Sequence, residues 1–162
     1  PDAGPLFSGE RAIDDQMSGT VYVLRSKSKI PFVLENKDVL HKIGVTGGSV
    51  ESRIANASKE STFLLAAVEV VATYKLFNIN RSKLENLLHK IFGAARVDIE
   101  IKDRFGNPVK PEEWFLVPSI AIKEAIDRIK DGSITSYKFN PKTARLEKND
   151  INWMIFLHSD II

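Results

Sequence analysis

The chain has 162 residues, of which 43% are hydrophobic and 27% charged, with a formal net charge of +2. These values are typical of one globular domain, and so small a positive charge permits a nucleic-acid partner without implying one. The absence of cysteine excludes disulfides, thiol catalysis and cysteine-ligated zinc. Because no apolar run reaches the roughly 18–20 residues that span a bilayer, we expect a cytoplasmic protein without a membrane partner.

Three segments rich in β-forming residues predict the central strands. Residues 20–24 are apolar on both faces, which suits a strand that is covered on both sides. Residues 39–45 predict a second strand, which pairs antiparallel with the first across a lysine-containing connection at 26–38. The valine-rich stretch 66–77 predicts a long third strand.

Three helices are predicted from capping residues and apolar spacing. Ser49 and Asn80 fit the N-caps of two helices, which end near residues 57 and 92. A third helix is predicted at 119–131 and is ended by Gly132.

Shorter segments complete the predicted fold. Further strands are predicted at 97–101, 114–117 and 137–139, and a turn at 103–108. The fold class is α+β, an α/β sandwich with a small, mostly antiparallel three-stranded central sheet and about three flanking helices.

The chain divides into three predicted parts. Residues 1–18 form an irregular lead-in, residues 19–118 the core, and residues 119–162 a C-terminal helix and tail that pack on the core. The apolar stretch 151–157 is too short to span a membrane, so it packs back on the domain or forms an oligomer contact. We favour packing back.

Glu85 and His89 are the first candidate site residues. Both lie at the edge of the apolar stripe of the second helix, one turn apart. A carboxylate at the rim of a buried face can reach a cleft, where a divalent cation would offset its desolvation. The alternative for Glu85 is a solvated residue paired with a lysine, and for His89 a packed, hydrogen-bonded histidine.

Arg53 borders the apolar face of the first predicted helix, and at this position we expect it to have an anionic partner. Its planar guanidinium suits phosphate, although a structural ion pair remains the alternative. Tyr22 and Lys42 lie on the first two strands. Considered singly, both are expected to be ordinary strand residues. Tyr22 would lie in the core or at its rim, and Lys42 would be solvated.

Basic residues outside these positions are candidates for contacts with a nucleic-acid backbone. They are Arg25, Lys27, Lys29 and Arg81. Short lysine-rich loops usually only solvate a protein, so solvation is the alternative for this set.

Five sequence pieces in order resemble the GIY-YIG nuclease superfamily. They are Gly-Thr-Val-Tyr at 19–22, Lys-Ile-Gly-Val-Thr at 42–46, Ser-Val-Glu-Ser-Arg-Ile at 49–54, Leu-Glu-x-x-Leu-His-x-x-Phe at 84–92 and Glu-Trp-Phe at 113–115. The last is typical of a branch common in phage and bacterial proteins. The resemblance covers roughly residues 19–118 and implies a nuclease core.

The resemblance implies roles for individual residues. The first-motif tyrosine corresponds to Tyr22, the helix arginine to Arg53 and the metal-binding glutamate to Glu85. The second-motif tyrosine falls on Lys42, as in some restriction enzymes of the family. Ala57 stands where other branches have a histidine, so His41 and His89 become candidates for handling protons.

The resemblance further implies a Mg²⁺- or Mn²⁺-dependent endonuclease that hydrolyses double-stranded DNA. Glu85 would hold the metal, Arg53 would bind the phosphate, and Tyr22 would orient and deprotonate the water. A phenol has an ordinary pKa near 10, so Lys42 is expected to help by favouring the phenolate. The alternatives are an inactive nucleic-acid-binding module of the same fold and an unrelated small interaction domain. A homodimer or a neighbouring specificity domain is a further expected partner.

Overall fold

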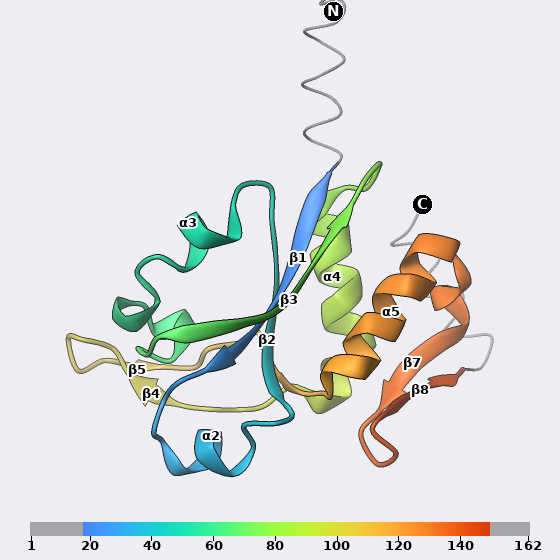
Figure 1. The fold of residues 1–162 in the computed structure, drawn as a ribbon. Coiled ribbons are helices and arrows are strands. Elements are labelled where there is room, and N and C mark those ends of the chain that lie inside the picture. The colour runs from blue at the N-terminus through green and yellow to red at the C-terminus, as the bar shows by residue number, and fades with distance from the viewer. Residues whose placement is uncertain (1–17, 150–162) are drawn as a thin grey trace, which may run out of the picture.

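The computed structural model describes residues 18–149, and a four-stranded antiparallel sheet lies at its centre (Figure 1). The strand order is β3-β1-β2-β6. The strands are Gly19–Ser26 (β1), Leu40–Thr46 (β2), Val68–Leu76 (β3) and Trp114–Leu116 (β6). The predicted lead-in up to residue 17 and the apolar stretch 151–157 lie outside the described residues.

Helices and two hairpins surround this sheet in the described part of the chain. The helices are Pro31–Glu35 (α2), Val50–Ile54 (α3), Arg81–Ile91 (α4) and Ser119–Asp131 (α5). The hairpins are Ile101–Lys102 (β4) with Pro108–Val109 (β5), and Tyr137–Asn140 (β7) with Arg145–Lys148 (β8). Single 3-10 turns are Ala57–Lys59, Ser61–Phe63, Gly93–Ala95 and Ser133–Ser136. The α+β class is confirmed, and residues 18–149 contain four central strands rather than three and four helices rather than three.

The structure corrects three of the predicted elements. The first helix ends at Ile54, and the chain tightens into a 3-10 turn that buries Ala57. The expected strand at 97–101 is replaced by a contact with β6, in which the Val97 amide donates to the Trp114 carbonyl oxygen at 3.0 Å, and Ile101 begins β4. The connection at 26–38 contains α2, which starts at Pro31, a residue well suited to a first helical position.

Register assigns each side chain of the central strands to one of two faces. Tyr22 pairs with Gly44 and Leu24 with Lys42, so these four residues share one face, called here the Tyr22 face. α3 and the 3-10 turns Ala57–Lys59 and Ser61–Phe63 cover this face, and α4 lies on the opposite side of the sheet (Figure 1).

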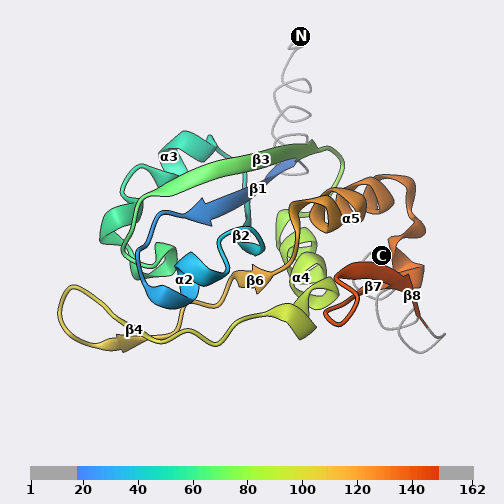
Figure 2. The ribbon, with the colours of Figure 1, turned by 60° about the horizontal axis from the view of Figure 1, so that its bottom comes forward.

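The opposite face, called here the α4 face, carries the larger hydrophobic core. Val21, Val23 and Ile43 of the sheet are buried there against the apolar sides of α4 and α5. The hairpin β7–β8 packs beside both helices (Figure 2). No helix in the described residues combines the length and hydropathy needed to cross a bilayer.

Candidate active site

α4 positions two of the candidate ligands. The Asn80 side chain accepts a hydrogen bond from the Lys83 amide at 3.0 Å and so caps the helix start, as predicted. The apolar stripe of α4 is buried on the α4 face; it consists of Leu84, Leu87, Leu88 and Ile91. Glu85 and His89 flank this stripe on consecutive turns and are half-buried.

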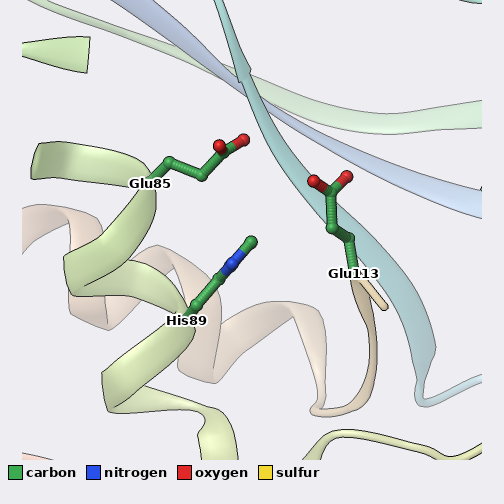
Figure 3. A group of neighbouring side chains, drawn as sticks. All are labelled: Glu85, His89 and Glu113. Carbon is green, nitrogen blue, oxygen red and sulfur yellow. The ribbon is translucent and has the colours of Figure 1, made fainter. Parts of the chain in front are cut away.

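Glu113 joins these two residues from the segment that precedes β6. One ligand atom of Glu85, one of His89 and one of Glu113 all lie within 4.8 Å of one another. The carboxyl group of Glu113 faces the two α4 side chains across the gap (Figure 3). Nε2 of His89 is buried and finds no hydrogen-bond partner among the described residues. Two carboxylates and an unpaired imidazole nitrogen at this spacing are a donor set that suits a divalent cation.

Glu113 is also the counterion of a buried lysine. Lys42 on β2 has no exposed side-chain area, and its Nζ donates to Glu113 Oε1 at 2.6 Å and to Thr62 Oγ1 at 3.0 Å. The ammonium also lies 5.2 Å from the centre of the Phe63 ring. Burial lowers the pKa of Lys42, and the carboxylate of Glu113 opposes this shift. Lys42 therefore holds Glu113 in place rather than facing solvent.

Tyr22 lies across the backbone of β2 with only 2% of its surface exposed. A Cβ atom at Gly44, its cross-strand partner, would overlap the Tyr22 ring, so the bare backbone at Gly44 makes room for the phenol. Burial raises the pKa of Tyr22. The Arg53 guanidinium, which also hydrogen-bonds the phenol, lowers the pKa, whereas Glu113 and Glu85 raise it. The pKa of Tyr22 is thus raised overall, and the ammonium of Lys42, which was expected to favour the phenolate, forms an ion pair with Glu113.

Arg53 contacts the phenol of Tyr22 and is itself partly exposed to solvent. Its side chain is 37% exposed, and its guanidinium lies 4.9 Å from the centre of the Phe63 ring. Nη1 is 3.7 Å from Glu60 Oε1, a long and partly exposed ion pair that contributes little stability. Arg53 thus makes the structural pair foreseen as an alternative, yet it keeps exposed guanidinium surface next to Tyr22.

Five candidate residues therefore meet at one place. The charges of Glu85 and Glu113 act on both Tyr22 and Lys42, and so does that of Arg53. The catalytic set predicted from sequence is Tyr22, Lys42, Arg53, Glu85 and His89, and the structure brings it together around Glu113. Their individual roles stay predictions.

Sequence reasoning missed Glu113 as a site residue. Its neighbour Trp114 is fully buried, and its indole nitrogen donates to the Thr62 carbonyl oxygen at 3.0 Å. In the sequence, the large apolar pair Trp114-Phe115 predicts core packing, and this signal draws attention away from the carboxylate beside it. The Glu-Trp-Phe motif was the one feature that could have revealed Glu113.

The basic residues predicted to contact nucleic acid lie near the two ends of β1. Arg25 is occupied within the chain, since its Nε donates to the Lys37 carbonyl oxygen at 2.8 Å and Nη1 lies 3.8 Å from Glu69. Lys27 and Lys29 are exposed in the connection from β1 to α2. Arg81 lies at the other end of β1, at the start of α4.

His41 is a packed histidine on the α4 face. It is fully buried, and its Nδ1 donates to the Val117 carbonyl oxygen at 2.7 Å. Burial lowers its pKa below the ordinary value of 6.5, against the effect of that hydrogen bond. His41 is not part of the cluster of Glu85, His89 and Glu113, and its ring nitrogens face the Val117 carbonyl oxygen and Arg25, so it is not placed to handle protons at the site.

His41 makes stability depend on pH. Because its pKa is lowered on folding, the unfolded chain binds more protons between the two pKa values. The free energy of unfolding should therefore fall as the pH drops from 6.5 through the folded pKa, and His41→Gln should reduce this fall. Urea unfolding of both proteins across this range measures the effect. An NMR titration that gives His41 a pKa above 6.5 would contradict the prediction.

Comparison with known protein families identifies the domain. The family model described as the T5orf172 domain matches residues 19–130. The chain belongs to the T5orf172 domain family. This family is associated with nuclease-like or DNA-binding functions, and hence with nucleic acid as a partner.

The family predicted from sequence was therefore wrong. T5orf172 is a different family from the GIY-YIG superfamily. The resemblance rested on short pieces in a common order, and it already departed from that pattern at Lys42 and Ala57.

A relative of this T5orf172 domain is the uncharacterized protein YeeC of Bacillus subtilis (strain 168). The two are 43% identical over 116 residues, which is 72% of this chain and 30% of YeeC. The chain thus spans about a third of the length of this curated relative. Among solved structures, none matches the chain significantly.

Proposed function

We propose that this T5orf172 domain is a metal-dependent endonuclease that hydrolyses phosphodiester bonds of DNA. The observation that carries the proposal is the convergence of Glu85, His89 and Glu113 within 4.8 Å of one another. Arg53 suits a phosphate and Tyr22 suits a water molecule. Both lie close to this cluster, since the charges of Arg53, Glu85 and Glu113 all shift the pKa of Tyr22.

The three ligands suit Mg²⁺ or Mn²⁺. Nε2 of His89 lacks a hydrogen-bond partner among the described residues, and two half-buried carboxylates repel each other at this spacing. A bound cation would satisfy the nitrogen and offset the repulsion. Carboxylates favour magnesium and manganese, and the imidazole adds a preference for manganese over magnesium. When bound, such an ion would act as a Lewis acid that neutralises negative charge on the phosphate and on the departing oxygen.

The remaining residues bind the phosphate, orient the attacking water and hold Glu113 in position. Arg53 donates from its exposed guanidinium to the phosphate oxygens as negative charge builds on them. Tyr22 keeps its proton, because its pKa is raised, and orients the attacking water through its hydroxyl. Lys42 holds the carboxylate of Glu113 toward Glu85 and His89.

Plasmid cleavage tests the proposal. The purified protein is incubated with supercoiled plasmid and Mg²⁺ or Mn²⁺, in parallel with EDTA. Metal-dependent nicking supports the proposal. Salt-sensitive binding without cleavage under any of these conditions would overturn it in favour of a non-catalytic nucleic-acid-binding module.

Arg53 provides a prediction with a matched control. Arg53→Ala should lower the cleavage rate by about 10²-fold, as expected for a lost donor to the transition state. Glu60→Gln removes the ion pair of Arg53 and should leave the rate close to wild type. Single-turnover cleavage of both variants measures the difference. Equal losses in the two variants would mean that the ion pair, not the phosphate contact, matters.

A further inference from the structure

A concave site lies where the ends of β1, β2 and β3 meet the start of α4. Its volume is about 490 Å³. The lining residues of this pocket, called here the Arg81 pocket, are Ser18, Gly19, Thr20, Gly47, Gly48, Lys75 and Arg81. None of these is acidic, and two are cationic. Two cations and a hydroxyl-bearing rim, as the described lining residues supply, suit an anion.

Two glycines set the position of the Arg81 side chain. Its Nη1 donates to the Ser18 carbonyl oxygen at 2.8 Å. A Cβ atom at Gly19 would lie 2.9 Å from Arg81 Cγ, and one at Gly47 would lie 2.7 Å from Arg81 Cζ. The guanidinium therefore lies against bare backbone at Gly47, and any side chain there would displace it.

Strand register places this pocket beside the candidate active site. Thr20 pairs with Thr46 on β2 and with Lys75 on β3. Thr20 and Tyr22 are two residues apart on β1, so they share the Tyr22 face with Cα atoms about 6.6 Å apart. The Arg81 pocket therefore lies at the end of β1 that is next to Tyr22.

An exposed aromatic ring lies next to the pocket. Phe77 follows the end of β3 and is 68% exposed. The Lys75 ammonium lies 5.5 Å from the centre of its ring. A cation and an exposed aromatic ring side by side suit a nucleotide, because the phosphate contacts the cation and the base or sugar packs on the ring.

We propose that the Arg81 pocket binds a backbone phosphate of DNA other than the one that is cleaved, with Phe77 packed against the adjoining nucleotide. Lys75 and Arg81 supply the positive charge. The proposal extends the proposed function by adding a DNA contact outside the cleavage site, but it requires only that the protein binds DNA.

Substitutions at neighbouring glycines provide a matched test. Gly47→Ala displaces the Arg81 guanidinium, whereas Gly48→Ala meets nothing within 4 Å and serves as the control. Lys75→Gln removes the second cation. Binding of a fluorescent DNA duplex is measured by anisotropy in EDTA over a range of salt concentrations, so that no cleavage interferes.

The proposal predicts weaker and less salt-dependent binding. Gly47→Ala and Lys75→Gln should each raise Kd by about 5- to 10-fold, and each should lower the slope of log Kd against log salt by about 0.9, as for one lost phosphate contact. Phe77→Ala should raise Kd without changing the slope. Gly48→Ala should bind as the wild type does.

The outcomes separate this proposal from the proposed function. Unchanged Kd and slope in Gly47→Ala and Lys75→Gln overturn the pocket proposal, whether or not the wild type cuts plasmid. A changed slope in a protein that never cuts supports the pocket and overturns only the nuclease. Amide NMR shifts at Gly47 on adding inorganic phosphate, without any binding of DNA, would assign the pocket to a free anion and overturn the proposal.

Discussion

Glu85→Gln should lower the rate of DNA cleavage by about 10³-fold, which corresponds to roughly 4 kcal/mol of activation free energy. The amide keeps the size of the carboxylate but loses its charge, so the cluster with His89 and Glu113 retains one carboxylate for a divalent cation. Folding should be unaffected, because Glu85 is half-buried and flanks the apolar stripe of α4 without being part of it.

Single-turnover cleavage with Mg²⁺ and with Mn²⁺ measures this effect. Glu112→Gln is the matched control, because Glu112 is exposed and adjoins Glu113 but is not part of the cluster. The control should cleave at the wild-type rate. Nicking by Glu85→Gln at the wild-type rate would refute the proposed nuclease site.

Glu113→Ala should destabilise the fold by about 3 kcal/mol, because it leaves the buried ammonium of Lys42 without a counterion. The carboxylate is 27% exposed, so some of its attraction is already screened by water, and we place the loss at the lower end of the range for buried pairs. The Thr62 hydroxyl would remain as the hydrogen-bond acceptor of Lys42 that the described residues supply.

A double variant separates charge from packing. Lys42→Met combined with Glu113→Gln removes both charges and keeps apolar contact with Phe63 and Trp114, so it should recover most of the lost stability. Urea unfolding at neutral pH measures all three proteins. A stable Glu113→Ala variant would show that Lys42 finds water or another acceptor, and that it does not depend on Glu113.

Local patterns allowed the elements around the site to be predicted. The apolar spacing of α4 and α5, the caps Ser49 and Asn80, and the stop at Gly132 are properties of neighbouring residues, and the structure confirms each of them. Gly132 has the positive φ of 84° that a helix-ending glycine adopts.

Long-range pairing could not be predicted in the same way. β6 is only three residues long, and it joins the sheet through pairs with Leu40, His41 and Lys42 that are far away in the chain. The contact between Lys42 and Glu113 spans 71 positions. Sequence alone suggested a solvated lysine and a packed Trp-Phe pair, and only the register of β2 and β6 turns them into part of one site.

The absence of a side chain at Gly44 reaches beyond local packing. The phenol of Tyr22 lies over that residue. The size of residue 44 therefore determines how far the hydroxyl extends toward Arg53 and the carboxylates. A survey of this family that looks for reactive groups would pass over position 44. Yet the missing methyl group there is a steric determinant of chemistry, and relatives with a bulkier residue at the equivalent position must hold their tyrosine at another height.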